Sequence, residues 1–173
     1  MSFKFNASAL ALTALFAAGA SHAQQPNPLD AIPENLPANV PYGAPISLER
    51  ADAALAGALA SAKAKGWPLV CAVVDSGAAL VSFKRMDGAQ LGSIDISQHK
   101  ARAAAKFRRE TKAFEAGIQG GSTYLVTLDD LIGSRGGVPL VEGGKLIGAI
   151  GCSGGTGSQD EVAAKAGVAA IIK

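Results

Sequence analysis

The segment that most constrains the fold is Leu146–Glu161, in which an apolar stretch is followed by closely spaced glycines and then by a helix start. The apolar part predicts a buried strand, and Ser158 followed three residues later by Glu161 matches the capping box of a helix N-terminus. Glycines let a main chain approach a bound group closely, and amides at a helix N-terminus attract anions. We therefore expect a strand, a tight loop and a helix, with a loop that either lines a ligand site or only turns the chain.

The rest of the chain alternates between helical and strand patterns. Ser47 is a good N-cap for a helix in which leucine and alanine recur at helical spacing as far as about Lys65. Ser76-Gly77 and Gly143-Gly144 join apolar runs into two hairpins. The patterns predict, in order, helix 47–65, strands 69–75 and 80–86, helices 93–108 and 112–118, strands 138–141 and 145–153, and helix 158–172. This order favours an α+β fold with an antiparallel sheet covered by helices.

The N-terminus has the features of a secretory signal. Lys4 precedes an apolar run at 7–20, and the triplet 21–23 supplies small residues at the cleavage position. The run is too short and too rich in alanine for a membrane span of about 20 apolar residues. We expect a periplasmic or secreted protein with a signal peptide at 1–23, a Pro-rich N-terminal arm at 24–44 and one domain at 45–173.

Charge and cysteine content limit the partners. The chain has 16 basic and 14 acidic residues, and so small an excess gives no footprint for nucleic acid or anionic lipid. We expect no nucleic-acid partner and no membrane insertion. Cys71 and Cys152 both fall in predicted strands, where an oxidising compartment would permit a disulfide, and two buried thiols are the simpler alternative. Because no Cys-x-x-Cys or His-Cys cluster occurs, no structural zinc site is expected.

The glycine-rich loop partly matches two functional motifs. Gly151-x-Ser153-x-Gly155 fits the nucleophile elbow of serine hydrolases, but the predicted helix starts about five residues after Ser153 and no histidine follows it. A phosphate cradle needs a lysine after the glycines, and Asp160 and Glu161 already occupy the positive end of the helix dipole. The loop therefore favours a carbonyl or carboxylate ligand, with candidate contacts at Ser153, Gly154, Gly155 and Gly157.

His99 and three charged residues are the other candidates. His99 lies on the predicted 93–108 helix beside its alanine stripe, and it is the only histidine after the signal peptide. Histidine ligates metals and haem iron, although a lone histidine is more often a packed or interface residue. Arg85 and Lys100 suit the carboxylates of a ligand, whereas Asp87 before a glycine fits a tight turn. We assign ligand binding to these four residues and metal binding to His99.

Several motifs in a fixed order along residues 47–173 together resemble a known family. They are Val74-Asp75-Ser76-Gly77, Arg85-Met86-Asp87-Gly88-Ala89, Lys100-Ala101-Arg102-x-Ala104-Ala105, Phe107-Arg108-Arg109-x-Thr111, Gly136-Gly137-Val138-Pro139-Leu140 and Gly148-Ala149-Ile150-Gly151-x-Ser153-Gly154-Gly155 with Gln159-Asp160-Glu161. The set closely resembles the GlcG/HbpS-like haem-binding family. The resemblance implies haem as cofactor, homo-oligomers from dimer to octamer, and a central antiparallel sheet of about five strands flanked by helices in profilin-like layers. A threonine common in that family is replaced here by Ala103.

Three functional hypotheses follow. The first is an exported protein that binds haem or a related tetrapyrrole in haem, iron or redox sensing, with His99 as axial ligand and Arg85 or Lys100 at the propionates. The alternative is an isomerase or lyase acting on a small organic or aromatic acid, with Asp75, Asp87 or His99 as general base and loop amides stabilising an enolate. A third is a protein-binding module that contacts a membrane sensor through the Pro-rich arm and exposed arginines.

Overall fold

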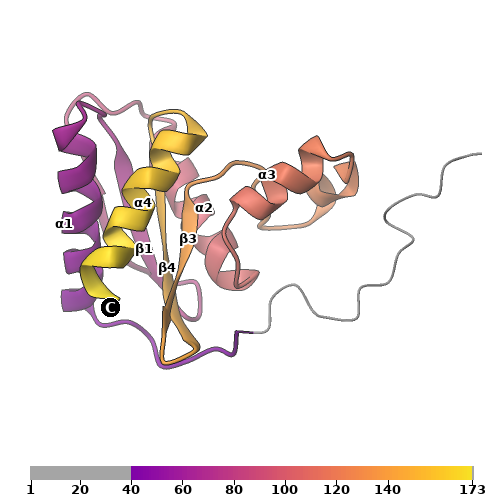
Figure 1. Ribbon diagram of the computed structural model, residues 1–173, viewed down its shortest axis with the longest axis horizontal. Helices are drawn as coiled ribbons and strands as arrows, with labels where there is room; N and C mark the ends of the chain where they lie inside the picture. Colours follow the sequence, from indigo (N-terminus) through magenta and orange to yellow (C-terminus); the bar gives the residue numbers. More distant parts are fainter. Residues whose placement is uncertain (1–39, 173) are drawn as a thin grey trace, which may run out of the picture. The chain divides into compact units, whose positions relative to one another are not determined.

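The computed structural model describes residues 40–172 (Figure 1). The predicted signal peptide lies outside the described residues, as does the Pro-rich arm up to residue 39. The elements are α1 Leu48–Ala64, β1 Val70–Asp75, β2 Leu80–Arg85, α2 Ser93–Lys106, α3 Lys112–Gln119, the 3₁₀ helix η2 Thr123–Thr127, β3 Gly137–Glu142, β4 Lys145–Ser153 and α4 Gly157–Ile171. The predicted order of helices and strands is confirmed, and η2 is an addition that no sequence pattern indicated.

The strands form an antiparallel sheet in the order β2-β1-β4-β3. The predicted α+β class is confirmed, but the described part of the chain has four strands where the resemblance implied about five. Beyond the end of β1, Tyr42 forms a single bridge with Leu146, and the Gly43 amide donates to the Leu146 carbonyl at 2.7 Å. The last residues of the Pro-rich arm are thus paired with the domain. No described helix has the length and hydropathy needed to cross a membrane.

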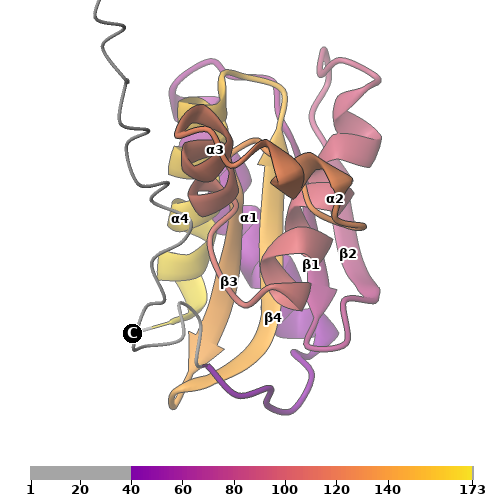
Figure 2. The ribbon, with the colours of Figure 1, turned by 90° about the vertical axis from the view of Figure 1, so that its right-hand side faces the viewer.

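Helices cover both faces of the sheet. α1 and α4 pack on one face, and α2 packs on the other (Figure 2). Between the sheet and α1 and α4 lies a core with large side chains such as Leu55, Val73 and Ile150. The α2 side is built instead from small ones, among them Ala101, Ala104 and Ala149. α3 and η2 lie to one side of these layers (Figure 1).

α2 lies unusually close to the sheet because the strands beneath it carry glycines. A β-carbon at Gly151 would lie 2.2 Å from the Ser97 carbonyl oxygen, and one at Gly137 would lie 2.3 Å from the Lys100 carbonyl oxygen. The alanine stripe of α2 is fully buried here. The flat partner expected for this stripe is therefore the sheet itself, which leaves no room for a ligand.

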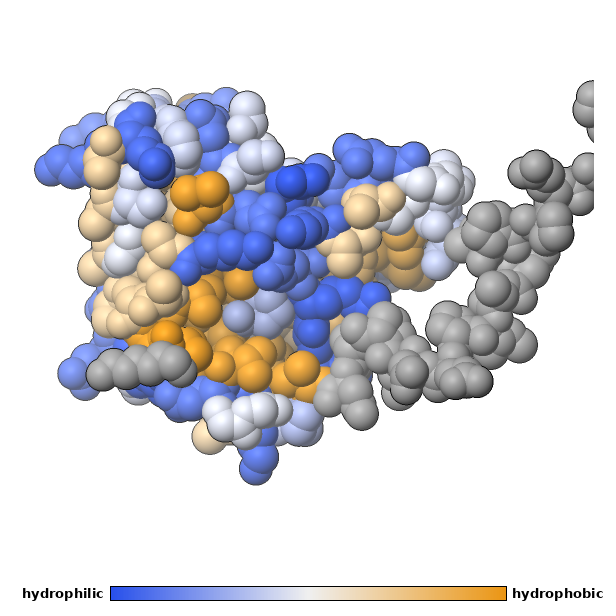
Figure 3. Space-filling model, viewed as in Figure 1, coloured by the Kyte–Doolittle hydropathy of each residue, from blue (hydrophilic) through white to orange (hydrophobic). Residues whose placement is uncertain are grey.

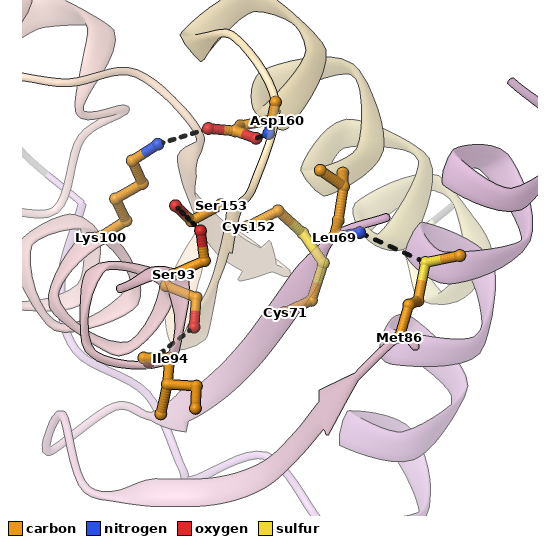
Figure 4. The surroundings of a disulfide bond; sticks show 11 residues. Leu69, Cys71, Met86, Ser93, Ile94, Lys100, Cys152, Ser153 and Asp160 are labelled. Carbon is orange, nitrogen blue, oxygen red and sulfur yellow. Dashed lines mark hydrogen bonds and ion pairs between the residues drawn. A yellow bond between two sulfur atoms is a disulfide. The ribbon is translucent and has the colours of Figure 1, made fainter. Parts of the chain in front are cut away.

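The structure settles one detail that the sequence left open, the pairing of the cysteines, and corrects another, the position of the α4 cap. Cys71 and Cys152 face each other in register on β1 and β4 and form a disulfide (Figure 4). The capping box of α4 is not at Ser158, as predicted, but at Thr156, whose hydroxyl accepts from the Gln159 amide while the Gln159 side chain accepts from the Thr156 amide. Ser158 already lies inside α4, so it cannot be the N-cap, and Glu161 instead pairs with Lys112 of α3 and Lys165 of α4.

Candidate functional site

The glycine-rich loop closes on the body of the domain. A β-carbon at Gly154 would lie 2.7 Å from the Pro68 carbonyl oxygen, and Gly154 itself has a φ of +137°. The buried hydroxyl of Ser153 hydrogen-bonds that of Ser93 at the start of α2, at 3.1 Å (Figure 4). At Gly157 an added β-carbon would contact the Arg135 side chain at 2.8 Å. The loop is therefore packed against protein at Ser153, Gly154 and Gly157, whereas Gly155 is exposed.

The carboxylate expected at this loop is provided by the protein itself. The Gly155 amide donates to Oδ1 of Asp160 at 3.0 Å, and Nζ of Lys100 lies 2.7 Å from Oδ2. The two side chains are only 2% and 3% exposed. Burial raises the pKa of Asp160, and the hydrogen bond and charge of Lys100 oppose that rise. Lys100 thus neutralises an internal acid, and in this conformation it cannot reach the carboxylate of a ligand.

Arg85 and Asp87 lie elsewhere on the surface. Arg85 is exposed at the end of β2, opposite Val70 in register. Asp87 is exposed in the following turn, where Gly88 has a φ of +79°. Within the described residues, no hydrogen bond or ion pair joins Arg85 or Asp87 to His99 or Lys100.

His99 lies on the outer side of α2 in a surface that we call the His99 face: His99, Arg102, Lys106 and Asp130. His99 and Arg102 are half-buried. Lys106 forms an ion pair with Asp130, and its hydrogen bond lowers the pKa of that carboxyl, with smaller contributions from the charges of Arg102 and His99. Arg102 and Lys106 follow His99 at helical spacing, which is a signal present in the sequence. Asp130, which has a φ of +64°, gave no sequence signal.

Large apolar side chains are exposed on α2 and on the segment around η2. Ile96, one turn before His99 on α2, is 37% exposed. The others are Leu91, Tyr124, Val126 and Leu128. Exposed apolar groups of this size are typical of surfaces that bind a ligand or another protein. Within residues 40–172 no group of three or more metal-binding side chains occurs.

A groove of about 460 Å³ runs beside the edge strand β3. We call it the β3 groove; its lining residues are Val40, Arg108, Glu110, Val138, Pro139, Val141, Lys165, Val168 and Ala169. Apolar side chains gather on this face of the molecule (Figure 3). The sequence could not indicate it, because its walls come from segments far apart in the chain.

The structure defines an α+β domain in which helices cover both faces of an antiparallel sheet. The family described as "Haem degrading protein HbpS-like" matches residues 46–169. This chain belongs to the HbpS-like family, as the motifs indicated.

Individual relatives agree with this assignment. Protein GlcG of Escherichia coli K12 is 42% identical over 108 residues, which cover 62% of this chain and 81% of GlcG. A double mutant of HbpS from Streptomyces reticuli has a TM-score of 0.71 at 26% identity, covering 83% of this chain and 99% of HbpS. A PduOC–haem complex has a TM-score of 0.67 at 27% identity, covering 73% of this chain and 95% of PduOC.

Proposed function

We propose that this protein is exported and binds haem, or a related tetrapyrrole, on the His99 face. One observation carries the proposal: the single histidine of residues 40–172 is half-buried beside two cations in a chain of the HbpS-like family. The crystallised complex of the structural neighbour PduOC with haem supports the choice of ligand.

The residues of the His99 face suit each part of haem. The imidazole of His99 would hold the iron, and Ile96 offers apolar surface to the macrocycle. Arg102 and Lys106 would pair with the propionates, in place of Lys100, which is paired with Asp160, and of Arg85, which lies at the end of β2. Lys106 would first leave Asp130, an exposed partner whose loss costs little.

Titration of the purified protein with haemin tests this proposal. We expect a shift of the Soret band that is lost in His99→Ala and kept in Gln98→Ala, a matched change at the preceding residue of the same helix. Arg102→Ala should weaken binding about tenfold, since a hydrogen bond to a charged group contributes about 1.5 kcal/mol. An unchanged Soret shift in His99→Ala would refute the assignment of the axial ligand.

The export part of the proposal has its own support and test. The disulfide between Cys71 and Cys152 suits an oxidising compartment. Mass spectrometry of the protein from its native host should find Gln24 as the first residue. An intact N-terminus in the cytoplasmic fraction would contradict export.

Assembly and signalling belong to the same proposal. The exposed apolar side chains around η2 would be covered in a homo-oligomer, between dimer and octamer, and haem, iron or redox sensing would involve a sensor protein. Light scattering after gel filtration should give a mass above that of one chain. A monomer at every concentration would contradict this part.

The structure offers no support for the isomerase or lyase alternative. Oδ1 of Asp75 accepts hydrogen bonds from the amides of Gly77 and Ala79, at 2.8 and 3.0 Å. Asp75 thus stabilises a turn, and Asp87 is exposed in another. Neither carboxylate lines the β3 groove, and His99, the third candidate base, is assigned to haem, so we do not propose this activity.

A further inference from the structure

The first residues that the structure describes lie beside the β3 groove. Val40 is the first described residue and lines the groove. Its carbonyl accepts a hydrogen bond from Nη1 of Arg108 at 3.1 Å, and the Arg108 guanidinium lies 5.3 Å from the ring centroid of Tyr42. The Tyr42 hydroxyl in turn donates to the Lys106 carbonyl at 2.8 Å. These contacts hold Val40, the residue that follows Asn39 in the sequence, against the groove.

The outer edge of β3 favours an apolar occupant over an added strand. The amide of Gly137 donates to Oγ1 of Thr111 at 2.9 Å, and its carbonyl accepts from the Thr111 amide at 3.0 Å. The polar backbone groups of Gly137 therefore point away from β4, and by alternation those of Pro139 do so as well. Because proline has no N–H, this edge offers a partner few backbone hydrogen bonds.

The composition of residues 33–39 matches such a groove. The segment Pro33-Glu34-Asn35-Leu36-Pro37-Ala38-Asn39 has two prolines and one leucine. The residue before a proline favours extended backbone, and an extended Pro-rich segment loses little entropy on docking. Seven residues reach roughly 20 Å at the polyproline rise, enough to run along an edge strand.

Charge also agrees. Residues 33–39 carry one acid, Glu34, and no base. Of the charged residues that line the groove, Lys165 is already paired with Glu110 and Glu161, whereas Arg108 makes no ion pair within the described residues. The segment lies before the HbpS-like match, which begins at residue 46, so its role is separate from the fold of the family.

We propose that residues 33–39 of the same chain occupy the β3 groove, with Leu36 against Val141 and Val168. The segment covers the apolar wall beside the edge strand and closes that edge to other chains. This inference does not depend on haem binding.

Methyl NMR on the chain beginning at Gln24, with leucine and valine methyl groups labelled, tests the proposal. We expect nuclear Overhauser contacts from the Leu36 methyls to those of Val141 and Val168. Leu36→Ser should abolish these contacts and shift the methyl signals of both valines. Leu29→Ser, the same change outside the segment, is the matched control and should leave them in place.

Other occupants give different results. A mixture of labelled and unlabelled chains, observed with an isotope filter, detects only contacts between chains. Leu36 contacts that survive this filter would show that a second copy supplies the segment, and would overturn the proposal. Absence of any Leu36 contact, or valine signals that ignore Leu36→Ser and move only when haemin is added, would overturn it as well.

Discussion

The two sides of α2 differ sharply, although they are built from neighbouring residues. Lys100 points inward and has a buried acid as its partner at 2.7 Å, while His99 lies on the outer side, half-buried beside exposed apolar side chains. One residue along a helix is a rotation of about 100°, enough to separate a structural role from a binding role. A cation whose partners are all internal maintains the fold, and a half-exposed histidine is free to meet a ligand.

The largest effect should come from breaking the inner pair. Lys100→Met leaves Asp160 buried and without its cation, which should lower the free energy of unfolding by about 3–5 kcal/mol. The double variant Lys100→Met with Asp160→Leu should recover most of that loss, because no charge remains buried. Urea unfolding measures both. A loss below about 1 kcal/mol in the single variant would contradict a structural role.

A smaller effect is expected from adding one methyl group under α2. Gly151→Ala should destabilise the protein by about 1–3 kcal/mol, because the new β-carbon would lie 2.2 Å from the Ser97 carbonyl oxygen. Gly92→Ala is the matched control, since nothing lies within 4 Å of its added carbon and its φ is −59°. Thermal unfolding should separate the two; equal midpoints would show that α2 can move away.

On the outer side of α2, a substitution should change the stability of the protein only slightly. His99→Ala should change the free energy of unfolding by no more than about 0.5 kcal/mol, as for a surface position without buried partners. Chemical unfolding in the absence of haemin measures this. A loss of unfolding free energy comparable to that of Lys100→Met would instead identify His99 as a packed residue. The two sides of α2 would then not differ in their contribution to stability.

The smallest effect is a pH dependence at Asp130. Its pKa lies below the ordinary value because of the Lys106 hydrogen bond, so its contribution to stability is present above the unfolded pKa and is lost as pH falls through the folded one. Because the pair is exposed, the contribution should be well under 1 kcal/mol. Asp130→Asn should remove this part of the acid dependence in unfolding curves between neutral pH and pH of about 3. Parallel curves for the two proteins would contradict it.

The order of the elements, the Ser47 cap, both hairpins and the family could all be predicted from the amino-acid sequence. These depend on periodicity, turn residues and short motifs, which are local. The sequence did not indicate the shift of the α4 cap to Thr156, because two overlapping polar patterns compete at that helix start.

Contacts between residues that are far apart in the sequence follow only from the three-dimensional fold. Lys100 forms an ion pair with Asp160, which lies 60 residues later in the sequence, and Cys71 forms a disulfide with Cys152, 81 residues later. No local pattern encodes such pairs, since they depend on the register of β1 with β4 and on the close approach of α2. For the same reason Ser153 is buried, and Gly154 and Gly157 are packed against neighbouring residues, while His99 lies at the surface.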